Sequence, residues 1–165
     1  MGKIFFTADT HFGSDRLRLY ENRPFSTTEE MDEALIRRWN ETVGPEDTVW
    51  HLGDFGAEGH EAEILARLSG HIRLVKGNHD LRDNAWYRAA GFEEVYDLPV
   101  LFESFWLLSH EPLYVNTNMP YANLFGHVHA SPVYKDFSRQ HCCVCVERTD
   151  YAPISFDEVK RRVLG

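Results

Sequence analysis

Short apolar runs rich in aromatic and β-branched residues alternate along the chain with segments whose apolar residues recur at helical spacing. This alternation indicates an α/β fold rather than an all-β or all-α fold. Seven of the runs are predicted to be strands: Lys3–Ala8, Asp47–Leu52, His71–Lys76, Val95–Phe102, Ser104–Ser109, Ala122–Phe125 and Cys142–Glu147.

Four segments between or after these runs are predicted to be helices. The first begins at Ser26, where Glu29 completes a capping box, and ends at Gly44-Pro45. Its apolar residues repeat every four positions and form one buried stripe: Met31, Leu35, Trp39 and Val43. The other three are Glu61–Ser69, closed by a left-handed Gly70, then Asp80–Ala90, and a last helix from Ser155 with Glu158 in a second capping box.

The composition is that of an ordinary folded domain. Of the 165 residues, 43% are hydrophobic and 26% are charged, which excludes disordered, collagen-like and coiled-coil classes. One domain commonly holds about 100–200 residues. The chain shows no internal repeat or linker, so we expect a single domain over residues 1–165.

The charge balance is acidic. Lys and Arg total 17 against 26 Asp and Glu, which gives a formal net charge of -9 at pH 7. Affinity for nucleic acids and anionic lipids comes largely from Lys and Arg that displace counterions. We therefore expect no extended nucleic-acid surface and no membrane partner, and the oligomeric state is left open.

The three cysteines, Cys142, Cys143 and Cys145, are crowded into four positions and lack C-x-x-C spacing. We expect them to be small buried hydrophobic residues rather than parts of a disulfide framework or zinc site. No apolar run approaches the roughly 18 residues of a membrane span, and the first residues lack the layout of a leader. The expected location is the cytoplasm.

Polar side chains that can bind metals follow five of the apolar runs directly. Open α/β sheets place their sites at the carboxyl ends of strands, so we expect these side chains to converge. In chain order, they belong to Asp9 and His11, Asp54, Asn78 and His79, His110, and His127 and His129.

The spacing of these residues adds detail. In an extended backbone, the polar residues of Asp9-Thr10-His11 point the same way, as do those of His127-Val128-His129, so each pair can grip one ion. Gly53, Gly77 and Gly126 precede donors and permit close backbone approach. Imidazole, carboxylate and amide donors without thiolate suit manganese, iron, zinc or cobalt.

The ordered series Asp-x-His, Gly-Asp, Gly-Asn-His-Asp, a lone His and Gly-His-x-His resembles the calcineurin-like metallophosphoesterase superfamily. It runs from Asp9 to His129 and so covers most of the chain. With Arg23-Pro24-Phe25 ahead of the first helix, the small chain is similar to the short bacterial and phage phosphoesterases of that superfamily. The implied fold is α/β, with two packed mixed β-sheets flanked by helices in a four-layer αββα sandwich.

The resemblance also implies two metal ions bridged by Asp54. The first would be held by Asp9, His11, Asp54 and His129, and the second by Asp54, Asn78, His110 and His127. The expected cofactors are divalent transition-metal ions, manganese first, with iron, zinc, nickel and cobalt as alternatives. Of the other histidines, His51 is expected in the core or behind the ligands.

The implied activity is hydrolysis of small phosphoesters, diesters or monoesters of nucleotide type among them, by attack of a metal-bridging hydroxide. His79 would stand beside the ions and, as an imidazolium, protonate the leaving alkoxide or stabilise the developing charge. Asp80 either orients His79 or, in the interpretation we favour, starts the following helix as a first-turn acid.

Two other functions are weighed against this one. A nuclease of the DNA-repair branch would be expected to carry a basic groove or a capping domain, and this acidic chain has room for neither. A non-catalytic scaffold should have lost ligand positions, and none is substituted. Arg23 is a candidate contact for a substrate phosphate. Asn40 and residues 116–121 are candidates for lining the pocket, with a structural role as the alternative for each.

Overall fold

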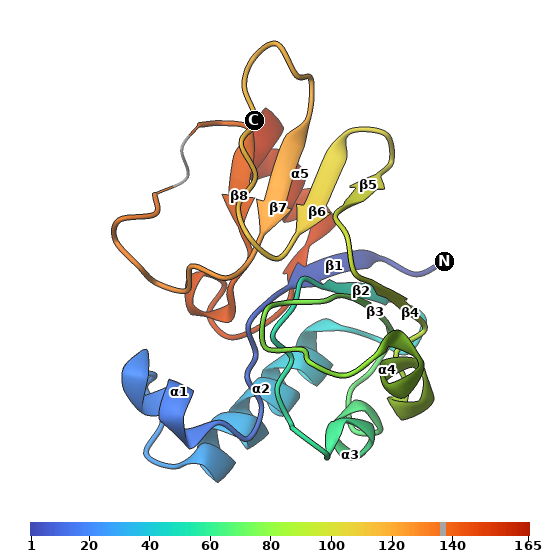
Figure 1. Ribbon diagram of the computed structural model, residues 1–165, viewed down its shortest axis with the longest axis vertical. Helices are drawn as coiled ribbons and strands as arrows, with labels where there is room; N and C mark the ends of the chain where they lie inside the picture. Colours follow the sequence, from blue (N-terminus) through green and yellow to red (C-terminus); the bar gives the residue numbers. More distant parts are fainter. Residues whose placement is uncertain (136–137) are drawn as a thin grey trace.

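The computed structural model describes residues 1–135 and 138–165, and its strands form two sheets (Figure 1). The first has five strands in the order β4 (Glu94–Tyr96), β3 (His71–Val75), β2 (Thr48–His51), β1 (Ile4–Thr7) and β9 (Ile154–Ser155). The second has four strands in the order β5 (Val100–Phe102), β6 (Trp106–Ser109), β7 (Ala122–Phe125) and β8 (His141–Cys143). The helices are α1 (Asp15–Tyr20), α2 (Thr28–Thr42), α3 (Glu61–Leu65), α4 (Asn84–Ala90), α5 (Phe156–Leu164) and a 3₁₀ turn at Val146–Arg148.

Both sheets are mixed. Strands β1 to β4 are parallel and β9 pairs with β1 in the opposite sense, while β6, β7 and β8 are parallel and β5 is antiparallel to β6. The carboxyl ends of β1, β2 and β3 therefore lie at one edge of the first sheet, and those of β6 and β7 at one edge of the second. The expected pair of packed mixed sheets flanked by helices is confirmed.

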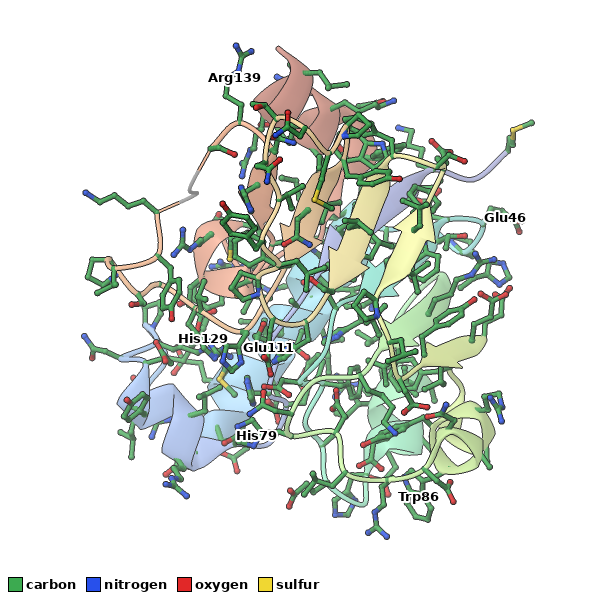
Figure 2. The ribbon with its side chains drawn as sticks, turned by 45° about the horizontal axis from the view of Figure 1, so that its top comes forward. Glu46, His79, Trp86, Glu111, His129 and Arg139 are labelled. Atoms are coloured by element: carbon green, nitrogen blue, oxygen red, sulfur yellow. The ribbon has the colours of Figure 1, made fainter. Side chains whose placement is uncertain are left out.

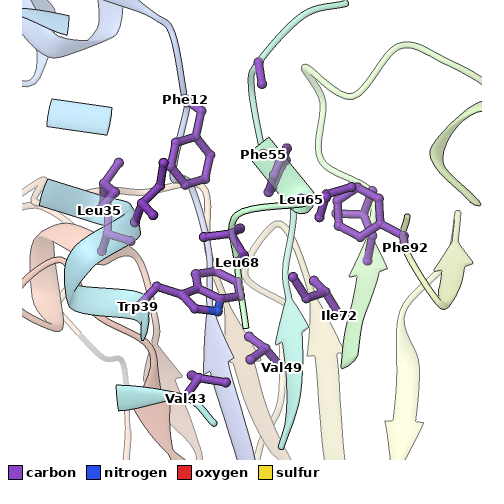
Figure 3. Close-up of a cluster of buried hydrophobic side chains, with 14 of the residues drawn as sticks. Phe12, Leu35, Trp39, Val43, Val49, Phe55, Leu65, Leu68, Ile72 and Phe92 are labelled. Carbon is purple, nitrogen blue, oxygen red and sulfur yellow. The ribbon is translucent and has the colours of Figure 1, made fainter. Parts of the chain in front are cut away.

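Alternation along the strands divides the core into two layers. Phe5 and Val49 pack in a cluster with residues of α2, α3 and α4. Figure 3 shows part of this cluster, including Leu35 of α2, Leu65 of α3 and Val49. The next residues along the two strands, Phe6 and Trp50, face the second sheet and pack in a cluster that also contains Leu124. Because successive strand residues point to opposite faces, one buried strand serves both layers.

The run Val95–Phe102, predicted as one strand, is two strands in different sheets. It breaks at Pro99, between β4 and β5, because proline has no N–H to donate to a ladder. Two short elements, α1 and β9, were not predicted, since neither has a long periodic pattern. The predicted strand Cys142–Glu147 is shorter than expected and gives way to the 3₁₀ turn.

Helix ends differ from expectation by local capping. The side chain of Thr27, not Ser26, accepts the N–H of Glu30 and caps α2. Helix α4 begins at Asn84 under the cap of Asp83, and α3 ends at Leu65, four residues earlier than predicted. Ser155 caps α5 by accepting the N–H of Glu158, as predicted. Over the ranges that the structure describes, no helix has the length and apolar character needed to cross a bilayer.

Candidate metal centre

The loops that leave β1, β2, β3, β6 and β7 bring the predicted donors to one place. Two of these residues, His79 and His129, are labelled in Figure 2, on the same side of the molecule. The ring of His11 links them, since its centroid lies 5.7 Å from that of His79 and 5.3 Å from that of His129. Residues 118 positions apart in the chain thus meet at one site.

A first group of donors consists of Asp9, His11 and His129, whose ligand atoms lie within 4.8 Å of one another. Nε2 of His11 is 3.6 Å from Oδ1 of Asp9, and Nε2 of His129 is 3.5 Å from the same oxygen. Asp9 Oδ1 and His11 Nε2 are buried and have no hydrogen-bond partner. Buried polar atoms are rarely left unpaired, so these two atoms fit a site for a cation.

A second group lies beside the first, and Asp54 faces donors of both. Oδ2 of Asp54 is 3.5 Å from Nε2 of His11 and 3.3 Å from Nε2 of His110. Oδ1 of Asn78 is 2.9 Å from Nε2 of His110 and 3.2 Å from Nδ1 of His127. Asp54 therefore stands between two sets of nitrogen and oxygen donors.

The backbone of the donor pairs is left-handed, not extended as predicted. Asp9 and His11 have φ values of 60° and 48°, and His127 and His129 have values of 72° and 51°. The two members of the second pair also belong to different groups, because His127 faces Asn78 and His129 faces Asp9. The expectation that each pair grips one ion is therefore wrong for His127 and His129.

The three predicted glycines, Gly53, Gly77 and Gly126, all lie where a Cβ would clash with groups at or behind the donors. Gly53 has φ +103°, and a Cβ there would lie 2.5 Å from Nδ1 of His110. A Cβ on Gly126 would lie 2.4 Å from Oδ2 of Asp9. Both distances are too short for any side chain, so only glycine lets the loops approach the donors this closely.

Hydrogen bonds fix which nitrogen of His110 and which nitrogen of His129 faces the site. Nδ1 of His110 is 2.8 Å from the carbonyl oxygen of Leu52, which can only accept, so Nε2 is left for the donor group. Nδ1 of His129 is 2.8 Å from Oε2 of Glu147, which leaves its Nε2 toward Asp9. In both rings the outer partner orients the inner nitrogen.

The buried carboxylates create a strongly negative field. Burial opposes ionisation of Asp9, but the neighbouring imidazoles of His11, His110 and His129 hold the pKa of Asp9 well below its usual range. Burial also disfavours a charged His110, yet Asp54 and Asp9 outweigh that effect and raise the pKa of His110 to about 9. The site therefore favours positive charge between these carboxylates.

His79 lies outside both groups and is exposed. Its backbone N–H donates to Oδ1 of Asp54 at 2.9 Å, so the main chain of His79 is fixed to the shared carboxylate while the imidazole is free to face solvent.

His51 lies behind the donors, as predicted. It is completely buried, and burial lowers the pKa of His51 to about 3, so the ring is neutral. Thr10 donates its hydroxyl proton to the carbonyl of Phe55, so it accepts from Nε2 of His51, whose Nδ1 accepts the N–H of Gly53. The neutral ring thus ties the loop after β1 to the loop after β2.

Asp80 has neither of the roles predicted for it. Its Oδ2 accepts the N–H groups of Asp54 at 2.7 Å and Gly77 at 2.8 Å, and its Oδ1 accepts the N–H of Phe55 at 3.2 Å. Helix α4 starts later, at Asn84, with Asp83 as its cap. Burial raises the pKa of Asp80, opposed by these three donors. Asp80 clamps together the two loops that carry Asp54 and Asn78.

Three other predicted contacts lie elsewhere. Arg23 is buried, and its guanidinium binds Glu147 and the carbonyls of Asp9 and Thr10 instead of facing a substrate. Asn40 bridges α2 to the turn after α3. Residues 116–121 precede β7, at the end of that strand opposite to the donors, so they do not line the site.

Two residues behind the site were missed. Glu147 contacts His129, and the thiol of Cys145 donates to Oδ2 of Asp9 at 3.3 Å. Glu147 ends the predicted strand Cys142–Glu147, so the rule that singled out the other donors, a polar residue at the carboxyl end of a strand, could have found it. All three cysteines are buried and none forms a disulfide, as predicted.

Sequence comparison identifies related proteins. A family model described as calcineurin-like phosphoesterase matches residues 2–141. An uncharacterized protein of Methanocaldococcus jannaschii is 32% identical over 172 residues, which cover 99% of this chain and 92% of that protein. The Gene 66 protein of Mycobacterium phage L5 is 36% identical over 85 residues, which cover 48% of this chain and 41% of the phage protein. The predicted resemblance is confirmed.

Two solved structures have a similar fold. A protein of unknown function from Aquifex aeolicus aligns over 98% of this chain and 99% of its own, with a TM-score of 0.74 and 25% identity. The nuclease MPE of Pseudomonas putida aligns over 76% of this chain and 61% of its own, with a TM-score of 0.53 and 22% identity. The second similarity concerns the fold alone.

Replacing Asp80 with alanine should lower the free energy of unfolding by about 3 kcal/mol, because three buried peptide N–H groups lose their acceptor. Urea unfolding with a chelator present measures this without a contribution from bound metal. The control is Asp83→Ala, which removes a single exposed cap and should cost about 1 kcal/mol. Equal losses in the two variants would contradict the clamp.

Proposed function

The chain belongs to the calcineurin-like phosphoesterase family, and on that premise we propose that it is a metal-dependent phosphoric ester hydrolase acting on small phosphoesters. Diesters and monoesters of nucleotide type are the substrates we expect. The observation that carries the proposal is the pair of donor groups joined by Asp54, with buried atoms of Asp9 and His11 unpaired and facing the first group.

The donors divide naturally between two ions. We assign the first ion to Asp9, His11, Asp54 and His129, and the second to Asp54, Asn78, His110 and His127. Carboxylate, imidazole and amide donors fit divalent transition metals, with manganese first and iron, zinc, nickel or cobalt as alternatives. When bound, the two ions supply a water nucleophile of lowered pKa and neutralise charge on the phosphoryl group.

The protein's own residues orient the site and supply a proton donor. Asp54 Oδ1 holds the main chain of His79 while Oδ2 faces the donors, so one carboxylate sets the distance between His79 and the metal site. The exposed imidazole of His79 can then deliver a proton to the leaving oxygen. Asp80 and His51 keep the donor loops in register without contacting the substrate.

Charge favours a small substrate. The net charge of -9 leaves few cations for a polymer of phosphates, and Arg23 is bound to Glu147 and to backbone carbonyls behind the site. We therefore propose a small phosphoester as the partner and no extended nucleic-acid surface. The buried cysteines form no disulfide, which suits a reducing compartment, so the cytoplasm is the proposed location.

Asp54→Ala should lose at least one of two bound metal equivalents and more than about 100-fold in kcat/KM. Mutating a residue that only supports a metal ligand already lowers metal affinity or activity by about 10–100-fold, and Asp54 is proposed as a ligand itself. Metal analysis and an assay with manganese check this. Asp97→Ala, which removes an exposed partner of Lys76, is the control and should keep both values. Unchanged stoichiometry and activity in Asp54→Ala would refute the shared ligand.

His79→Ala should keep both metals but lose about 10²- to 10⁴-fold in kcat on substrates with a basic alkoxide leaving group. The loss should be much smaller on nitrophenyl esters, since nitrophenolate leaves without a proton. His60→Ala, at an exposed histidine that pairs with Glu63, serves as the control. An equal loss on both substrates would mean that His79 acts on binding or charge instead.

The rate on the best substrate should change little between low and physiological salt. A protein that contacts Z phosphates of duplex DNA shows a log-log salt slope of about -0.9Z, so a nuclease with many contacts would weaken steeply. The measurement is kcat/KM against salt, with long single- and double-stranded DNA as competitors. Strong inhibition by DNA that added salt relieves would favour a nuclease.

A further inference from the structure

His129 is held from behind by a carboxylate that is itself out of solvent. Oε2 of Glu147 lies 2.8 Å from Nδ1 of His129, and the Glu147 side chain is only 3% exposed. A carboxylate accepts, so the proton of the neutral ring is on Nδ1. Nε2 is then unprotonated and turned toward Oδ1 of Asp9, 3.5 Å away.

Arg23 holds this carboxylate in place. Its Nε and Nη2 donate to Oε2 of Glu147 at 3.1 and 3.0 Å. The same guanidinium donates from Nη1 to the carbonyl of Thr10 and from Nη2 to the carbonyl of Asp9. One planar group therefore fixes the left-handed backbone of Asp9 and the orientation of Glu147 together.

The pair is costly if stability is its only purpose. The side chains of Arg23 and Glu147 are 0% and 3% exposed. The free energy needed to move two charges out of water offsets much of the free energy of their attraction. Apolar residues of similar volume in their place often stabilise a fold as well or better. The pair contacts Asp9 and His129. A role in ordering these two residues accounts for the presence of the pair.

We infer that Glu147 and Arg23 are positioning residues for the first metal ion. Glu147 fixes the tautomer and ring orientation of His129, and Arg23 aligns Glu147 with the backbone that carries Asp9. The inference rests on the proposed function, because it assigns a metal to Asp9 and His129. It adds two residues that contact neither the ion nor the substrate.

The test is manganese binding to the metal-free full-length chain, measured by calorimetry. The unmodified protein should bind two ions. In Glu147→Ala one of the two sites should weaken about 10- to 100-fold and the other should keep its affinity. Glu147→Gln keeps an acceptor oxygen but not the charge, so its loss should be smaller. Arg23→Lys should resemble Glu147→Ala, because an ammonium cannot make the forked contact.

The chain offers a matched control. Glu93 also contacts a histidine and an arginine, His71 and Arg73, but on the surface and away from the donors. Glu93→Ala should therefore leave both manganese affinities unchanged. Circular dichroism checks that each variant is folded. If Glu147→Ala does not fold, the manganese affinities of Glu147→Gln are compared with those of the unmodified protein instead.

A spectroscopic readout separates orientation from simple destabilisation. In proton NMR spectra of the zinc-loaded protein, the imidazole N–H signal of His129 is identified by its absence from the His129→Gln variant. This signal should be protected from exchange with solvent. It should broaden or disappear in Glu147→Ala, and persist in Glu93→Ala.

The outcomes are distinct. Two unaltered sites in Glu147→Ala, with two in the unmodified protein, would overturn this inference and leave the proposed function standing. Loss of a whole equivalent in Glu147→Gln would also overturn it, since Glu147 would then be a ligand. Absence of metal binding in the unmodified protein would overturn the proposed function itself.

Discussion

Five donor residues have a left-handed backbone: Asp9, His11, Asp54, His127 and His129. For a residue other than glycine, holding the backbone in this sparsely populated region of φ and ψ costs about 1–3 kcal/mol of folding free energy. Such a backbone persists only where its surroundings over-determine it. Here the N–H groups of Asp9 and His11 donate to the carbonyls of Gly53 and Asp54, and the N–H of Asp54 donates to Asp80. These bonds are also what aims the donor side chains, so strain and site geometry have one origin.

The same loops connect the two sheets. Oδ2 of Asp9 accepts the backbone N–H of His127, from the loop after β7, and the thiol of Cys145, from the segment after β8. Its other oxygen faces His11 and His129. One carboxylate at the end of β1 is therefore surrounded by elements of the second sheet, and the packing of Phe6 and Trp50 against that sheet sets its position.

The donors could be found from the sequence because each is a polar residue placed directly after an apolar strand. Their backbone could not, since nothing in Asp9 or His127 signals positive φ as a glycine would. Arg23 and Glu147 are 124 residues apart, and no local pattern pairs them. Capping and strand breaks depended on single residues: Thr27 accepts where Ser26 was predicted to, and Pro99 divides one apolar run between two sheets.

The first donor group draws Asp9 and His11 from the end of β1 and His129 from the loop after β7. Any cation held there is a cross-link between the two halves of the fold. By linkage, a ligand that binds only the folded chain stabilises that chain by an amount that grows with the ligand's concentration and affinity. Metal affinity and the packing of the two sheets are then thermodynamically coupled. A substitution deep between the sheets would therefore change the affinity for the metal.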